Sequence, residues 1–134
     1  MVLVDTNVLF ALLIETDWSP SARDLHARDS DWRTEVHALV ELSNVLTRYV
    51  RVRKLTIGQA IAVLSSAQGL IGSGLCEVRH SDAMVVAVDT GVSAYDARFL
   101  CAAKLLGVNL VTEDVKLRKA APRQTVSLTE ALTS

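Results

Sequence analysis

The sequence has few of the residues that mark disulfide-rich or aromatic-rich proteins. Among its 134 residues are two cysteines and two prolines, and Phe, Trp and Tyr together make up 4%. Because Cys76 and Cys101 are too few for the disulfide framework of a small secreted domain, we expect reduced thiols and a cytoplasmic protein. An apolar fraction of 50% excludes a disordered chain and is enough to build a core.

Long hydrophobic runs are also missing. Acids such as Asp5 and Asp89 interrupt each apolar run well before the roughly 18 residues that a membrane span requires. The first residues, Met-Val-Leu-Val-Asp, lack the basic start of a secretory signal. The sequence therefore predicts neither a membrane-spanning nor a secreted protein.

The net charge is small but unevenly distributed. It is −1 for the whole chain, yet residues 1–47 carry eight acids and three bases, whereas residues 48–123 carry eleven bases and six acids. The basic half is suited to a polyanionic partner.

Short apolar strands alternate with longer helical patterns, and no internal repeat is present. Strands are predicted at 2–4, 33–37, 75–78 and 108–111, with an edge strand at 125–128. Helices are predicted at 7–14, 19–29, 38–53, from 57 to the glycines at 69–74, at 81–90 and 94–106, and after Asp114. This alternation favours an α/β fold with a parallel sheet between helices, and the length suits a single domain, residues 1–134.

Several helix ends carry local signals. Thr56 and Gln59 match a capping box, Ser93 is a predicted N-cap, and Gly107 lies where a C-terminal cap belongs. Ser19 before Pro20 is likewise read as an N-cap. Ser81 is read as a cap too, because the neighbouring letters His-Ser-Asp at 80–82 are too close together to align as a catalytic triad.

Four acids fall where an α/β sheet holds its ligands, at the carboxyl ends of the strands. Asp5 directly follows the first strand, and Asp114 follows the strand 108–111. Asp96 is predicted in the first turn of the helix capped by Ser93, and Glu41 in the first turn of the helix after strand 33–37. We call Asp5, Glu41, Asp96 and Asp114 the acidic quartet.

Each of these acids also has a structural interpretation. Asp5 and Asp114 suit helix N-caps, Asp96 suits the positive end of a helix dipole, and Glu41 suits a solvated helix edge. Four carboxylates at one edge would nevertheless repel one another or take up protons. Because Mg²⁺ and Mn²⁺ favour carboxylate oxygens, the quartet as a group predicts a divalent metal site.

Four motifs around these acids resemble those of PIN-domain ribonucleases. They are Val-Asp-Thr-Asn-Val-Leu at 4–9, Val-Glu-Leu-Ser-Asn-Val-Leu at 40–46, Tyr-Asp-Ala at 95–97 and Leu-Val-Thr-Glu-Asp at 110–114. The resemblance implies a Rossmann-like, three-layer fold with a five-stranded parallel sheet. It also implies metal-dependent cleavage of RNA by the quartet, with Asn7 and Thr112 supporting the acids.

The short form of the chain is similar to the toxins of virulence-associated toxin–antitoxin pairs. That resemblance implies a homodimer held inactive by a small antitoxin. The apolar content, a little above the usual range, also favours a buried interface, for which segments 7–14 and 38–50 are the most apolar candidates.

Two basic runs are candidates for contact with RNA phosphates. The first is Arg48, Arg51, Arg53 and Lys54, and the second is Lys116, Arg118 and Lys119. Solvated helix ends would look the same, because bases there favour the helix dipole. The low aromatic content argues against base stacking on an extended platform.

Other functions remain open on the sequence alone. A receiver-like phosphorelay domain is disfavoured because residues 36–76 contain no Asp. A dehalogenase-like phosphatase would have a second acid two residues after Asp5, where this chain has Asn7. The third alternative is a domain that binds RNA or a protein partner without catalysis.

Overall fold

Five short parallel strands form the centre of the structure, a computed structural model that describes residues 1–134. They are β1 (Val2–Val4), β2 (Trp32–Glu35), β3 (Leu75–Cys76), β4 (Leu110–Val111) and β5 (Thr125–Val126). Their order in the sheet is β3-β2-β1-β4-β5, and every pairing is parallel. The predicted α/β fold with a five-stranded parallel sheet is confirmed.

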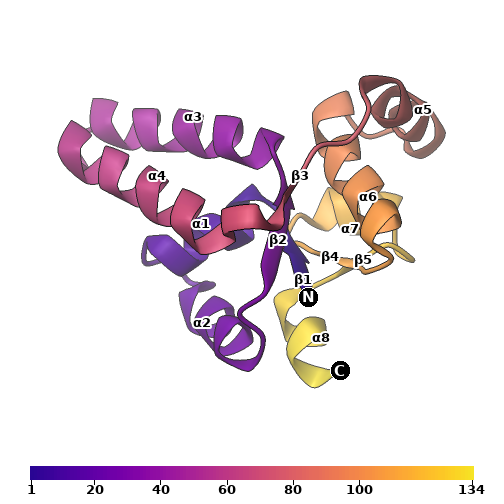
Figure 1. The fold of residues 1–134 in the computed structure, drawn as a ribbon, viewed down its shortest axis with the longest axis horizontal. Helices are drawn as coiled ribbons and strands as arrows, with labels where there is room; N and C mark the ends of the chain where they lie inside the picture. The colour runs from indigo at the N-terminus through magenta and orange to yellow at the C-terminus, as the bar shows by residue number, and fades with distance from the viewer.

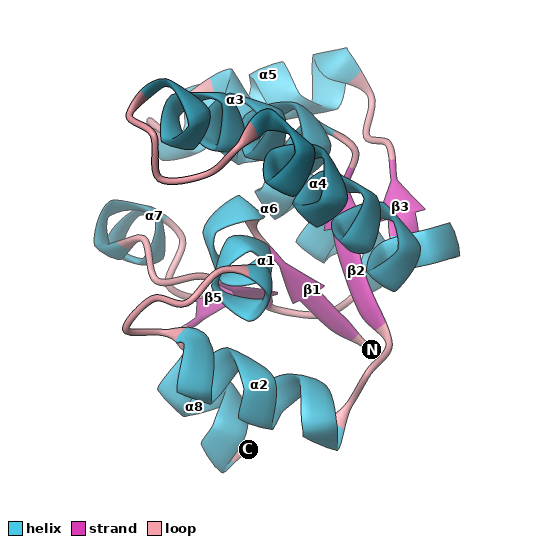
Figure 2. Cartoon of the chain, turned by 90° about the vertical axis from the view of Figure 1, so that its left-hand side faces the viewer, coloured by secondary structure: helices cyan, strands magenta, loops and turns pink.

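Helices cover both faces of this sheet. They are α1 (Thr6–Leu13), α2 (Ser19–Arg28), α3 (His37–Arg51), α4 (Ile57–Ile71), α5 (His80–Thr90), α6 (Ala94–Leu106), α7 (Val115–Ala120) and α8 (Leu128–Thr133). Helices α1 to α4 and α8 lie on one side and α5 to α7 on the other (Figure 1). The same arrangement, with α2 and α8 packed side by side, is visible from the side in Figure 2. No helix has the length and apolar character to cross a bilayer.

The central strand shows why the sheet needs both layers. Val2 and Val4 pack into the core under α1 to α4, whereas Leu3 packs into the core under α5 to α7. All three side chains are buried, as expected for a strand whose alternate residues point to opposite, covered faces. Two separate hydrophobic cores therefore fix β1 in the middle of the molecule.

Most of the predicted helix ends are confirmed, and two are wrong. The capping box of Thr56 and Gln59, the Ser93 cap and the left-handed Gly107 are all present. Ser81 does not cap α5, whose N-cap is Arg79 without a side-chain bond. Ser19 lies inside α2, and its hydroxyl donates instead to the carbonyl of Ala11.

The glycine-rich run 69–74 ends a helix, as predicted. Helix α4 ends at Ile71, and Gly72–Gly74 makes one turn of 3₁₀ helix before β3. A Cβ at Gly74 would lie 2.6 Å from the carbonyl oxygen of Trp32, so only glycine fits this close approach to β2.

The order of the strands creates one special position in the sheet. From β1 the chain goes to β2 and β3 on one side, and later returns to β4 and β5 on the other side. The connections from β1 and β4 therefore leave in opposite directions and open a crevice at the carboxyl ends of these two strands. Ligands bind at such a switch point in open α/β sheets.

Candidate functional site

The acidic quartet lines a single pocket at this switch point. The pocket has a volume of about 220 Å³, and all four acids contribute to its wall. Asp5 follows β1, Glu41 is on α3, Asp96 is on α6, and Asp114 precedes α7. The fold thus brings together four carboxyl groups that the sequence separates by up to 109 residues.

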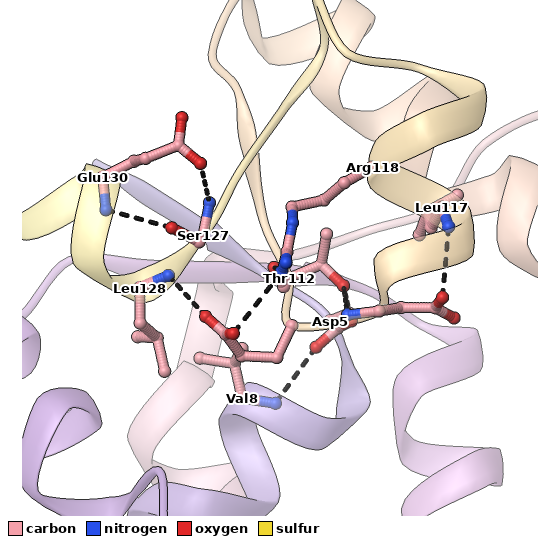
Figure 3. Close-up of polar contacts among 10 residues, drawn as sticks. Asp5, Val8, Thr112, Leu117, Arg118, Ser127, Leu128 and Glu130 are labelled. Atoms are coloured by element: carbon pink, nitrogen blue, oxygen red, sulfur yellow. Dashed lines mark hydrogen bonds and ion pairs between the residues drawn. The ribbon is translucent and has the colours of Figure 1, made fainter.

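Asp5 is buried and held through both carboxylate oxygens. Its Oδ1 accepts a hydrogen bond from the backbone N–H of Val8 at 3.0 Å, which caps α1. Its Oδ2 accepts one from the Thr112 hydroxyl at 2.5 Å (Figure 3). Asp5 is therefore both a helix cap, as the structural interpretation proposed, and a wall of the pocket.

Thr112 connects the two strand ends. Its hydroxyl donates to Asp5 and accepts from the backbone N–H of Asp114 at 3.0 Å. Asp114 in turn caps α7 by accepting from the N–H of Leu117 at 3.1 Å. The side chain of Thr112 is buried, so this bridge holds the ends of β1 and β4 in one fixed arrangement.

The other two acids come from longer helices. Glu41 lies in the second turn of α3, not the first as predicted, because α3 already begins at His37. Its Oε1 accepts from the Thr6 hydroxyl at 2.7 Å. Asp96 lies in the first turn of α6 as predicted, where Ser93 binds its backbone N–H, and its carboxylate oxygens accept no hydrogen bond from the chain.

No cation neutralises the quartet, since none of its members forms an ion pair. Burial raises the pKa of Asp5 to about 6, and the charges of Glu41 and Asp114 add to this rise, against the hydrogen bonds from Thr112 and Val8. Burial also raises the pKa of Asp96, with further contributions from Asp114 and Glu41. The pocket consequently favours either a proton or a cation.

The donor atoms suit a hard divalent cation that keeps part of its water shell. Both oxygens of Asp96, Oε2 of Glu41 and Oδ2 of Asp114 accept no hydrogen bond from the chain. No three His, Cys, Asp or Glu side chains stand close enough to hold one ion together. Mg²⁺ commonly uses one or two carboxylates and several waters, so the set of oxygens fits it without a closed protein cage.

Only part of the predicted RNA-binding run reaches the pocket. Arg48 lines it, together with the exposed Asn7, whose side chain makes no hydrogen bond within the chain. Arg51 is at the last position of α3, and Arg53 and Lys54 follow in the turn, all exposed. These three cations therefore lie beyond the pocket, at the far end of α3.

The second basic run is partly used by the fold. Arg118 donates to the carbonyl of Thr112 at 2.9 Å (Figure 3). It also pairs with Glu113 at 3.4 Å. Glu113 also accepts from the N–H of Leu128, which attaches the start of α8 to the end of β4. Lys116 and Lys119 remain exposed.

Sequence reasoning missed a further buried carboxylate, on the strand beside β1. Glu35 ends β2, is fully buried, and receives two hydrogen bonds of 3.0 Å from Arg98 of α6. The N–H groups of His37 and Val78 also donate to it. Burial alone would raise the pKa of Glu35, but the bonds from Arg98, His37 and Val78 outweigh it and lower the pKa. The only signal in the sequence was an acid inside the predicted strand 33–37.

Comparison with protein families matched residues 2–122 to the family described as "PIN domain". Comparison with curated proteins found no match. The crystal structure of PAE2754 from Pyrobaculum aerophilum is similar, with a TM-score of 0.78 at 21% identity over 98% of this chain and 86% of that one. FitAcB from Neisseria gonorrhoeae has a TM-score of 0.66 at 18% identity over 95% of this chain and 96% of that one. At these sequence identities, the similarity shows that this chain shares its fold with the two solved structures.

Proposed function

This chain belongs to the PIN-domain family, whose members are generally nucleases that bind Mg²⁺, and from that premise we propose that it is a metal-dependent endoribonuclease. It hydrolyses phosphodiester bonds of RNA, and residues 1–134 form one catalytic domain. The observation that carries the proposal is the pocket in which the four acids meet without a neutralising cation.

The acidic quartet would hold one or two Mg²⁺ or Mn²⁺ ions, with water completing their coordination. When bound, the metal lowers the pKa of a water molecule and offsets negative charge on the phosphate. Both carboxylate oxygens of Asp96 and one of Glu41 accept no hydrogen bond from the chain. Asp5 is the least mobile acid, because Val8 and Thr112 restrain both of its oxygens.

Other polar side chains around the quartet either position the acids or face the substrate. Thr112 positions Asp5 and Asp114 relative to each other, and Thr6 holds Glu41. Asn7 is exposed beside the pocket with a free amide, which suits a hydrogen bond to RNA. Arg48 supplies the positive charge that holds a phosphate near the acids, and Arg51, Arg53 and Lys54 extend that contact.

Metal titration and nuclease assays with Asp96→Asn test this function. The variant removes a charged oxygen ligand without changing the size of the side chain, so we expect weaker Mn²⁺ binding and a fall in kcat of about 100-fold or more. Asp89→Asn, which changes an exposed acid on α5, serves as the matched control. Equal calorimetric binding of Mn²⁺ by Asp96→Asn and the wild type would remove Asp96 from the metal site.

The two alternatives give different results in the same assays. A binding domain without catalysis would retain RNA without cleaving it in Mn²⁺. A phosphatase would hydrolyse a small aryl phosphate and leave RNA intact, and Asn7 in place of a second acid disfavours that chemistry. RNA cleavage that disappears when the metal is chelated supports the proposed nuclease.

The nuclease would act as the cytoplasmic toxin of a toxin–antitoxin pair. The resemblance of this short chain to such toxins supports the proposal, and so does the charge of the pocket, because a basic side chain of an antitoxin would be attracted to the free carboxylates. The expected outcome is loss of RNA cleavage when the product of the adjacent gene is added. Full activity in its presence would contradict an inhibitory role.

A homodimer remains part of the proposal, but one of the two candidate segments cannot form its surface. Segment 7–14 cannot form it, because most of its apolar side chains are buried in the core. Large apolar side chains are exposed instead on α5 and α6, among them Met84, Val85, Val88 and Leu105. Light scattering tests the dimer, and a monodisperse monomer at micromolar concentration would contradict it.

A further inference from the structure

A stacked pair of rings lies beside the acidic pocket. The imidazole of His37, at the start of α3, and the phenol ring of Tyr95, in the first turn of α6, have centroids 5.1 Å apart and planes inclined by 19°. Both rings line a shallow hollow of about 450 Å³, and Glu41 and Asp96 line the same hollow. We call this the lateral hollow. The two stacked rings and two members of the quartet thus share one surface.

The fold does not need the ring of Tyr95. The residue is 63% exposed, its hydroxyl makes no hydrogen bond within the chain, and the ring belongs to neither hydrophobic core. A flat aromatic face left in solvent next to an acidic pocket is a surface on which another planar group can stack. With so few aromatic residues in the chain, the location of this one is informative.

The exposed face of α3 continues the arrangement across the site. His37, Glu41, Asn44 and Arg48 follow one another at intervals of four, three and four residues, so they form one stripe along the helix. At about 1.5 Å per residue the stripe is roughly 16 Å long. The stripe begins with the imidazole ring of His37, includes Glu41 of the quartet, and ends with the guanidinium of Arg48. A single RNA strand could therefore place a base against the ring and a phosphate against the guanidinium.

The rest of the lateral hollow suits the edge and face of a base. Val40 is an exposed apolar contact, and the Asn44 amide offers both a donor and an acceptor. The Ser93 hydroxyl, which accepts from the N–H of Asp96, is a further polar group in the hollow. A hydrogen-bonding edge beside an aromatic face is the combination by which proteins hold unpaired bases of RNA.

We propose that the lateral hollow is a nucleobase subsite, in which a base of the RNA next to the cleaved phosphate stacks on the Tyr95–His37 pair. The inference rests on the proposed nuclease function and adds to it one contact with an unpaired base. Stacking explains how an anionic strand is held near four carboxylates, because attraction to a π face does not depend on charge. The subsite holds one base, so it is compatible with the low aromatic content that argues against an extended platform.

A short single-stranded RNA that carries the fluorescent base 2-aminopurine tests the subsite. Binding is measured with Ca²⁺ in place of Mg²⁺, and cleavage is measured separately in Mn²⁺. We expect the wild type to quench the fluorescence. Tyr95→Ala should lose most of the quenching and bind about 10-fold more weakly, since one stacked base contributes roughly that factor. Tyr95→Phe keeps the ring and should behave like the wild type.

Kinetics separate stacking from a general loss of structure. Tyr95→Ala should raise KM about 10-fold with little change in kcat, because the ring lies beside the acids and not among them. Ile61→Ala removes an exposed apolar side chain from α4, outside the hollow and the acidic pocket, and should change neither constant.

Three results would overturn the subsite. If Tyr95→Ala quenches and cleaves like the wild type, the subsite is refuted while the nuclease function stands. If Tyr95→Ala keeps its RNA affinity but loses affinity for a protein partner, the ring belongs to a protein interface instead. If the wild type neither binds nor cleaves RNA, the subsite and the proposed function fail together.

Discussion

Two buried carboxylates at the same edge of the sheet have opposite electrostatic surroundings. Glu35 ends β2 and Asp5 follows the adjacent β1, and their residues are 0% and 7% exposed. Arg98 and two backbone N–H groups bind Glu35, and the pKa of Glu35 is lowered. Asp5 faces the other acids of the quartet, and burial raises its pKa to about 6.

The difference separates an acid that serves the fold from acids available for a ligand. All the hydrogen bonds and the charge that Glu35 needs come from within the chain, and the N–H of His37 at the start of α3 is one of its donors. The pair of Glu35 and Arg98 thereby helps to position the helix that carries Glu41. The quartet has no such partner and remains available to a cation from solution.

The largest expected effect comes from breaking the neutralised pair. Arg98→Met leaves Glu35 buried without its counter-ion and should lower the free energy of unfolding by about 3–5 kcal/mol. Urea denaturation at pH 7 measures this loss. Arg33→Met is the control, because Arg33 pairs with the half-exposed Asp31 and such surface pairs contribute at most about 1 kcal/mol. A loss no larger than that of the control would mean that Glu35 tolerates burial without Arg98.

The titration of Asp5 should change the free energy of unfolding by up to about 3 kcal/mol. In the metal-free protein the folded state keeps the Asp5 proton up to a pKa of about 6, whereas an unfolded aspartate releases it near 3.8. The free energy of unfolding should therefore fall as the pH rises between these values, and the whole penalty should persist above pH 6.

The effect of divalent metal on stability should depend on pH in the same range. Mg²⁺ or Mn²⁺ should raise the melting temperature clearly at pH 7.5 and much less at pH 5, where the proton competes for the site. Asp5→Asn retains a good capping residue for α1 and should flatten the pH dependence between pH 4 and 6. Calorimetry of the metal-free wild type that showed no such decline would place the pKa of Asp5 near its ordinary value.

The smallest effect is expected from the only arginine that lines the acidic pocket. Arg48→Gln removes a phosphate contact and should reduce the slope of log Kd against log salt for RNA by about 1. The double variant Arg51→Gln, Arg53→Gln tests the cations beyond the pocket in the same titrations. An unchanged slope in the double variant would show that those two arginines form only a solvated helix end.

Local signals in the sequence were enough to predict most of the fold. The apolar strand 2–4, the capping box at Thr56 and the glycine at 107 each depend on neighbouring residues, and the structure confirms all three. Helix α8 was missed, although Ser127 and Glu130 form a capping box that the sequence already contains. The predicted helix 7–14 is confirmed, but its pattern also made it a candidate for the dimer surface. A helix that is apolar on all sides looks the same whether the rest of the fold or a partner buries it.

By itself the sequence determined the α/β class and the placement of Asp5, Asp96 and Asp114 at a strand end or helix start, because strand periodicity and helix caps are properties of adjacent residues. Only the tertiary structure decided which acids remain without a partner. Glu35 meets Arg98 across 63 positions, and His37 meets Tyr95 through the contact of α3 with α6. Such pairs form when separate elements pack against the same sheet, and no local pattern encodes them. Whether the charge of a side chain is neutralised therefore depends on the side chains that other elements of the fold place beside it.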